Sequence, residues 1–264
     1  MPFDVNGNIL TSLQVKLYND KRIVRNGIVL YLDAGISNSY PGSGTSWTDL
    51  NDNSRVATLS GYAGGSTPTY STLGGGSILF NRSTSLANSA AVFSLSAGGT
   101  TWADLTSTVS LSLWFYTGTS SVMILAGKGF RTTPSPQEFQ SYQFYTNGSS
   151  IIGRITAGGT TSNIDVSTSF SFNTWTNVVL TYNGSTVSVY KNGLLANSAS
   201  KTGSITNILS LPFVVGAQYN ANNSYNLPAD GFNGWIGQVL LYSNALSAAE
   251  VLQNFNATRK PYGI

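Results

Sequence analysis

Hydrophobic and polar positions alternate over short stretches through most of this chain. Between residues 109 and 115, Val109, Leu111, Leu113 and Phe115 fall on one side, and Ser110 and Ser112 on the other. Because successive side chains of a strand point to opposite faces, this pattern predicts a strand with one buried face and one face that is wet or only lightly covered. The run 28–32 is apolar throughout, which is typical of a strand covered on both faces.

Further strands are expected at regular short intervals, with turn residues between them. Asn183-Gly184 and Asn192-Gly193 separate alternating runs and predict type I′ turns, so residues 174–200 should form a three-stranded meander. Residues 35–76, rich in Gly, Ser, Thr, Asn and Pro, are expected to be mainly loop. The other predicted strands are 77–80, 122–126, 139–146, 151–156, 211–217 and 232–242. This pattern favours an all-β, two-sheet antiparallel sandwich.

A single helix is predicted near the C-terminus. Ser247 and Glu250 have the spacing of a capping box, and Val251, Leu252 and Phe255 follow as an apolar stripe. We expect the face that carries Val251 and Phe255 to dock on the sandwich.

The composition excludes several kinds of chemistry. The chain has no histidine and no cysteine, and charged residues make up only 9% of it. Imidazole bases, Ser-His-Asp and Cys-His nucleophiles, zinc sites and disulfides are therefore excluded. A net charge of +3 gives no indication of nucleic-acid binding.

The sequence also bears on where the protein acts. No run of about 18 apolar residues is present, so membrane insertion is not expected. Residues 1–8 lack the basic and apolar regions of a secretory leader, yet the polar, glycine-rich composition is typical of extracellular surfaces. A virion component, assembled in the host cytoplasm, would have both properties. The alternative is an extracellular or cell-surface protein that uses another export route.

We divide the chain into an N-terminal arm, residues 1–26, and a domain, residues 27–264. The arm is too short and polar to fold alone, so we expect it to attach by strand addition and charge to other virion proteins or to a second copy. A solvated arm is the alternative. The residues expected to make the attachment are Leu10, Leu13, Val15, Lys16, Leu17, Lys21, Arg22 and Arg25.

Several segments of the domain resemble one known family. They are 27–35, 39–50, 76–80, 111–115, 173–182 and 232–242 with the helix that follows. These segments are similar to laminin-G-like, concanavalin A-like domains of the kind found in structural proteins of tailed bacteriophages. The resemblance implies a jelly roll over residues 27–264 that binds glycans or proteins, often with a calcium ion at its rim.

Two loops have oxygen-bearing side chains suited to calcium. Asp49 and Asp52 stand beside Asn51 and Asn53, and Asp230 follows a run of asparagines. The alternative is that these side chains form turns and caps, as Asn and Asp usually do in loops.

The loop 218–230 combines aromatic and planar polar side chains, as carbohydrate sites do. Contact with a neighbouring subunit is the alternative for this loop. Trp47 and Trp102 lie in predicted loops and are the tryptophans expected at the surface, unless they plug the end of the sandwich; Trp114, Trp175 and Trp235 are expected in the core. The candidate glycan contacts are Trp47, Tyr219, Asn220, Asn223, Tyr225 and Asp230.

Catalysis is not expected. A retaining glycosidase needs two carboxyl groups about 5–5.5 Å apart. The chain has two glutamates, of which Glu250 belongs to the capping box and Glu138 follows a proline-rich loop. We therefore expect a non-enzymatic virion structural protein (a head decoration, neck, collar or fibre component) that is a homo-oligomer and displays a lectin-like domain. A carbohydrate-binding adhesin that recognises host-surface glycans is the alternative.

Overall fold

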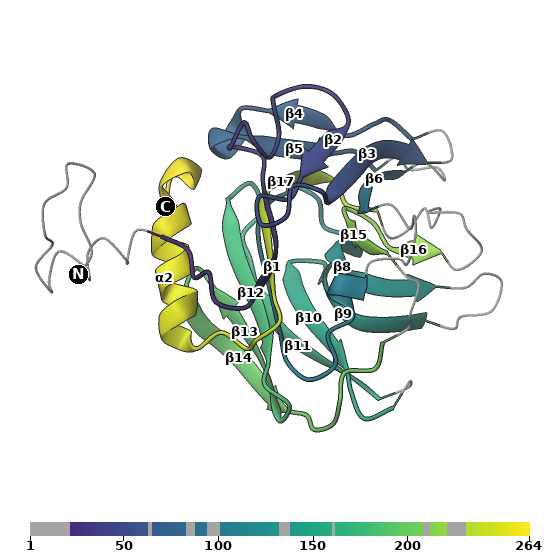
Figure 1. Ribbon diagram of the computed structural model, residues 1–264, viewed down its shortest axis with the longest axis vertical. Helices are drawn as coiled ribbons and strands as arrows, with labels where there is room; N and C mark the ends of the chain where they lie inside the picture. Colours follow the sequence, from purple (N-terminus) through teal and green to yellow (C-terminus); the bar gives the residue numbers. More distant parts are fainter. Residues whose placement is uncertain are drawn as a thin grey trace, which may run out of the picture.

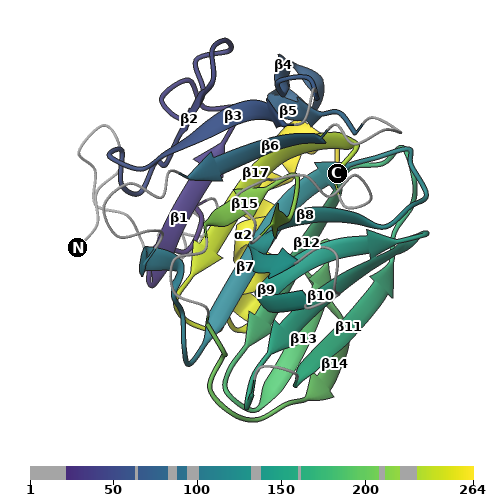
Figure 2. The ribbon, with the colours of Figure 1, turned by 90° about the vertical axis from the view of Figure 1, so that its right-hand side faces the viewer.

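The computed structural model describes residues 22–62, 65–82, 88–93, 101–131, 138–159, 162–207, 212–220 and 231–264. In this part of the chain two sheets pack face to face, and one α-helix lies against the outer side of one sheet (Figures 1 and 2). The predicted all-β, two-sheet antiparallel sandwich with a C-terminal helix is confirmed. No helix within the described ranges is long and apolar enough to cross a membrane.

The eight-stranded sheet has β17 near its middle. Strand β1 (Ile28–Asp33) pairs with the edge of β17 that β5 also uses, so β1 and β5 lie end to end. The order across this sheet is β14 (Leu194–Ser200), β13 (Thr186–Lys191), β12 (Thr176–Tyr182), β7 (Val109–Tyr116), β17 (Gly234–Tyr242), β5 (Ser77–Phe80) and β4 (Thr69–Ser71).

The nine-stranded sheet is antiparallel except where β16 (Tyr219–Asn220) runs parallel to β8. Its order is β11 (Asn163–Ser169), β10 (Ser150–Thr156), β9 (Glu138–Asn147), β8 (Met123–Arg131), β15 (Phe213–Val215), β6 (Asn88–Phe93), β3 (Val56–Tyr62) and β2 (Ser46–Thr48). Three short 3-10 helices, η1 (Leu73–Gly75), η2 (Thr101–Ala103) and η3 (Lys260–Tyr262), and α2 (Ala248–Thr258) complete the described elements.

The main core lies between the two sheets. The predicted inward face of β7, which includes Val109, Leu111 and Phe115, is fully buried there, and so are Leu30 and Leu32 of β1. Burying one such side chain is worth about 1.5–3 kcal/mol, so this inter-sheet layer is the main source of stability.

The outer face of β7 is not wet, and this part of the prediction is wrong. Ser110 and Ser112 are buried because α2 covers that face. The Ser110 hydroxyl donates to the Asn244 carbonyl and accepts a hydrogen bond from the Leu246 amide, both at 2.8 Å. Serine is tolerated there because the loop before α2 supplies these partners.

Helix α2 begins and docks as predicted. Ser247 accepts a hydrogen bond from the Glu250 amide, and the Glu250 carboxylate accepts one from the Ser247 amide, which completes the capping box. Val251 and Phe255 are buried against the sheet.

Aromatic rings fasten the end of α2 to the sheet. The Trp114 ring stacks on Tyr262 at 4.2 Å and on Phe255 at 5.7 Å between ring centroids. The Trp114 indole also donates to the Thr258 hydroxyl at 2.9 Å. Tyr262 lies close to the sheet because Gly237 has no side chain, and a Cβ there would clash with the tyrosine hydroxyl.

The meander of β12, β13 and β14 is confirmed, but its two turns differ. Asn192 and Gly193 have φ values of 49° and 81°, as a type I′ turn requires. At the other turn only Gly184 has a positive φ, and the Asn183 side chain accepts hydrogen bonds from the Ser185 and Thr186 amides. The type I′ prediction is wrong for that turn, because the Asn183 side chain closes a longer loop.

Residues 22–26 run across the inner side of α2. Ile23 and Val24 are buried beside Val251, in one apolar cluster with Tyr242. The Asn254 side chain accepts a hydrogen bond from the Val24 amide at 2.7 Å and donates to the Tyr242 hydroxyl at 3.0 Å. These bonds join the N-terminal segment, the helix and the sheet. Residues 1–21 lie outside the described residues, so the arm stays a prediction.

We predict that Asn254→Ala destabilises the protein by about 2–3 kcal/mol, because it leaves the buried Val24 amide without an acceptor. Asn256→Ala, on the exposed side of the same helix, should change stability by less than about 0.5 kcal/mol. Urea unfolding of both variants measures the difference. Equal stabilities would contradict a structural role for the Asn254 network.

Candidate functional site

A polar cluster lies on the outer face of the nine-stranded sheet, the face turned away from the core. In the strand register Arg154 of β10 stands opposite Gln143 of β9 on one side and Asp165 of β11 on the other. Residues directly opposite one another share a face, so the three side chains form a row across the sheet. Tyr145, two residues along β9 from Gln143, belongs to the same face.

Hydrogen bonds fix the geometry of this Arg154 cluster. The guanidinium binds both carboxylate oxygens of Asp165, from Nε at 2.6 Å and from Nη2 at 2.7 Å. The Tyr145 hydroxyl donates to Asp165 at 2.8 Å and accepts from Arg154 at 3.1 Å. Arg154 also donates to the Gln140 side chain at 3.1 Å and lies 5.0 Å from the centroid of the Tyr145 ring. A bidentate pair of this kind is directionally specific.

The charges of the cluster follow from these contacts. Burial alone would raise the pKa of Asp165, but the hydrogen bonds from Arg154 and Tyr145 and the arginine charge together lower it. Burial and the hydrogen bond to Asp165 raise the pKa of Tyr145 to about 12. At neutral pH the site therefore presents an ionised carboxylate, a guanidinium and a protonated phenol.

Nearly buried polar side chains lie beside the cluster. Gln140, Ser141 and Gln143 are exposed by no more than 3%. Within the described residues, the buried Ser141 hydroxyl has no hydrogen-bond partner. Amides, a hydroxyl and an ion pair on rigid strands can bind hydroxyl groups in fixed directions.

The first part of the predicted glycan loop joins the same sheet. Tyr219 and Asn220 form β16, which pairs with Phe130 and Arg131 of β8 in the same sheet. Asn223, Tyr225 and Asp230 lie outside the described residues, so their role stays a prediction.

The tryptophans differ in exposure. Trp47 is fully buried in the core between the sheets and presents no ring face to solvent. This burial agrees with the alternative, a ring that plugs the sandwich, and not with a glycan contact at the surface. Trp102 is partly buried, with the Arg55 guanidinium 5.1 Å from its ring centroid. Trp114 and Trp175 are buried as predicted, whereas Trp235 is only partly buried.

Asp49 and Asp52 form turns. One Asp49 oxygen accepts hydrogen bonds from the Tyr31 and Asn51 amides, both at 2.8 Å, and Arg55 lies 3.6 Å from the other oxygen. Asp52 accepts bonds from the Ser54 amide and hydroxyl. The cation beside Asp49 is thus the Arg55 side chain. This arrangement does not support a calcium site in that loop. Within the described ranges no three acidic side chains gather as metal ligands would.

Two of the predicted attachment residues, Arg22 and Arg25, are described and lie beside α2. Arg25 is exposed, with its guanidinium 5.1 Å from the Tyr31 ring centroid, and the Arg22 carbonyl accepts a hydrogen bond from Gln253. The other predicted attachment residues, between Leu10 and Lys21, are outside the described residues.

Sequence reasoning did not find the Arg154 cluster. Period-2 alternation in 150–156 and 163–169 would have placed Arg154 and Asp165 on polar faces. Their pairing depends on the register of β10 with β11, which only the fold determines.

Comparison with known proteins identifies the fold independently. The family described as the Concanavalin A-like lectin/glucanases superfamily matches residues 86–252, which is more than half of the chain. A search of the curated proteins gives no match.

Several solved structures are similar. The binding domain of botulinum neurotoxin DC in complex with rat synaptotagmin II gives a TM-score of 0.61 at 13% identity, over 88% of this chain and 52% of that one. The same binding domain in complex with SialylT gives 0.58 at 14% identity, with the same coverage. Domain 4 of AbnA, an extracellular arabinanase from Geobacillus stearothermophilus, in complex with arabinotriose, gives 0.59 at 15% identity, over 88% of this chain and 99% of that one.

These likenesses concern the fold. The chain spans about half the length of the neurotoxin binding domains that it matches.

We predict that Asp165→Asn lowers stability at neutral pH by about 0.5–1 kcal/mol, a modest value because the pair is partly exposed. The pKa of Asp165 is lower in the folded state than in the unfolded state, so the ionised carboxylate stabilises the fold above about pH 4, and this contribution is lost as the pH falls through the lowered pKa. Thermal unfolding of both proteins between about pH 2 and pH 7 should show the difference closing only at the acidic end. A difference independent of pH would contradict the assignment.

Proposed function

This chain belongs to the Concanavalin A-like lectin/glucanases superfamily, and from that premise we propose that it is a carbohydrate-binding domain that holds a glycan on the outer face of its nine-stranded sheet. The observation that carries the proposal is the Arg154 cluster: an ion pair, a tyrosine and buried amides fixed on three adjacent strands. Two of the similar structures are complexes with SialylT and with arabinotriose, which supports this ligand class.

The chemistry of the cluster suits sugar hydroxyls. A hydroxyl can donate to Asp165 and accept from Arg154 at the same time, and the half-buried Tyr145 ring adds apolar area beside them. Because the strands and the ion pair fix these groups before the ligand arrives, binding requires little ordering of side chains.

We propose binding without catalysis. A glycosidase acid needs a raised pKa, whereas the pKa of Asp165 is lowered. Glu250 is committed to the helix cap. A place in a virion, with the loops of the sandwich displayed outward and the arm as attachment, stays a prediction.

We predict that screening the whole chain on a glycan array reveals saturable binding that Asp165→Asn weakens by about tenfold or more, since a charged hydrogen-bond acceptor is lost. Asp52→Asn is the matched control, because it removes one exposed carboxylate but keeps a residue that can form the same turn. Calorimetry with the strongest array hit quantifies the affinity of each variant. Affinity that survives Asp165→Asn would overturn the site, and the absence of any glycan binding would overturn the function.

A further inference from the structure

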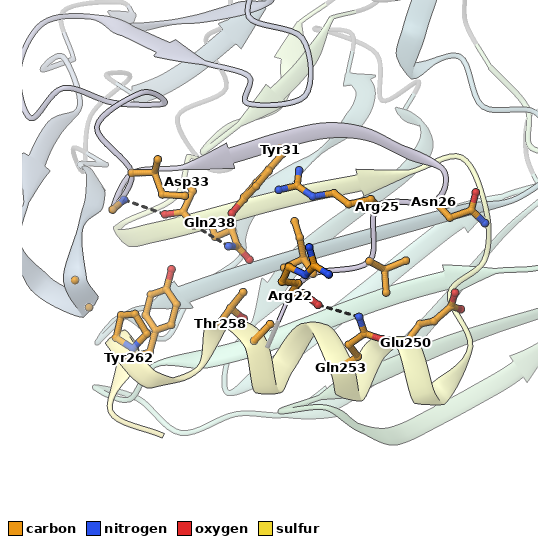
Figure 3. Close-up of a pocket in the computed structure, with 18 residues that line it drawn as sticks. Arg22, Arg25, Asn26, Tyr31, Asp33, Gln238, Glu250, Gln253, Thr258 and Tyr262 are labelled. Atoms are coloured by element: carbon orange, nitrogen blue, oxygen red, sulfur yellow. Dashed lines mark hydrogen bonds between the residues drawn. The ribbon is translucent and has the colours of Figure 1, made fainter. Parts of the chain in front are cut away.

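A cavity lies on the opposite side of the molecule from the Arg154 cluster, between α2 and the outer face of the eight-stranded sheet. This α2 groove has a volume of about 860 Å³ and is walled by residues 22–26, β1, η1, α2 and η3 (Figure 3). Ligand pockets usually measure about 300–1,000 Å³. The side chains used below are Arg25, Tyr31, Asp33, Gln238, Thr258 and Tyr262.

Asp33 closes one end of the groove. In Figure 3 its carboxylate lies at the end near Tyr262, Glu250 lies toward the other end, and Arg22 and Arg25 lie between them. One oxygen accepts a hydrogen bond from the Gly35 amide at 3.0 Å, and the other accepts one from the Gln238 side chain at 2.8 Å. Each oxygen keeps capacity for a further donor.

In the part of the chain that the structure describes, Asp33 has no counter-charge, because no lysine or arginine nitrogen there lies within ion-pair distance of its carboxylate. Burial raises the pKa of Asp33 despite the hydrogen bonds from Gln238 and Gly35. The other aspartates of the sandwich with a buried or half-buried carboxylate, such as Asp49 and Asp165, have an arginine beside them. A desolvated carboxylate without a counter-charge is costly, and a cationic ligand would remove that cost.

Two tyrosines flank the carboxylate. Tyr31 precedes it by two residues on β1. Burial raises the pKa of Tyr262 of η3, and the charges of Asp33 and Tyr31 add to this effect. Arg25 lies over the Tyr31 ring rather than against Asp33, which shows that this ring can accept a cation on its face. A carboxylate beside tyrosine rings is a favourable environment for a protonated amine.

We propose that the α2 groove binds a protonated amine at Asp33, and that its ligand is an amino sugar with a free amino group. The choice of a sugar rests on the proposed carbohydrate-binding function. It also agrees with the side-chain amide of Gln238, which lines the groove and can bind a sugar hydroxyl. Thr258 lines the groove too; its hydroxyl donates to the Asn254 carbonyl and accepts from Trp114, and it can accept one further hydrogen bond. Arg22 and Arg25, which lie between Asp33 and Glu250 in the groove, disfavour a ligand with many positive charges.

The test compares two probes that differ in one group: the trisaccharide of glucosamine, which has free amines, and that of N-acetylglucosamine, which is neutral. Calorimetry at about pH 6, where an ordinary amine is protonated, should show the glucosamine trisaccharide binding about tenfold more tightly. Asp33→Asn should abolish this preference and, as it removes an unpaired charge, leave the protein folded. Asp52→Asn should leave the preference unchanged.

Arg25→Gln provides a test in the opposite direction. This change removes the cation that occupies the Tyr31 ring, so glucosamine trisaccharide should bind about two- to fivefold more tightly. Equal affinity for the two trisaccharides, or a preference that survives Asp33→Asn, would overturn the proposal. A trilysine peptide that binds as tightly as the glucosamine trisaccharide would overturn its assignment to a sugar.

Asp165→Asn separates this inference from the proposed function. That variant should lose affinity for the array hit while it keeps its affinity for the glucosamine trisaccharide. If the array hit binds through Asp165 and the aminated probe does not bind through Asp33, only the groove assignment fails. If neither binds, the carbohydrate-binding function fails as well.

Discussion

The structure depends on one constraint: both faces of the eight-stranded sheet are apolar, so both need a cover. The inner face packs on the second sheet. The outer face carries Tyr31, Trp114, Leu240 and Tyr242, and α2 with Ile23 and Val24 buries them. The hydrogen bonds of Asn254 and the rings stacked on Trp114 hold this cover in place. Residues 22–26 and α2, which are far apart in the sequence, therefore form one layer (Figure 1).

This cover also determines where ligands can bind. Because α2 and residues 22–26 bridge the sheet without filling the space above β1, they leave the α2 groove beside Asp33. The nine-stranded sheet has its own polar cluster on the opposite side, where Arg154, Asp165 and Tyr145 satisfy one another. The two sites differ in charge balance: Asp165 has its counter-ion, whereas Asp33 lacks one among the residues that the structure describes. A neutral glycan suits the first site and an aminated one the second.

The sequence predicted the parts of the fold that depend on local patterns. Alternation gave β7, the apolar run gave β1, and Ser247 with Glu250 gave the start of α2. The prediction of a wet outer face for β7 was wrong. Serines at 110 and 112 are typical of a solvent-facing side, and only the fold shows that Ser110 has hydrogen-bond partners at Asn244 and Leu246. Strands β2 to β4 fall in a stretch dominated by turn residues, where short pairing with neighbours overrides local propensity. The sites could not be predicted, because each joins residues far apart in sequence: Arg154 needs the β10 register, and Asp33 needs the C-terminal segment above it.

The most direct test of the account is to map ligand contacts by NMR on isotope-labelled whole protein titrated with the glucosamine trisaccharide and, separately, with a neutral array hit. The account predicts chemical-shift changes around Tyr31, Asp33, Gln238 and Tyr262 with the first ligand, and around Gln143, Arg154 and Asp165 with the second. The account would be contradicted if both ligands changed the chemical shifts of the same residues, or if the changes fell outside both regions.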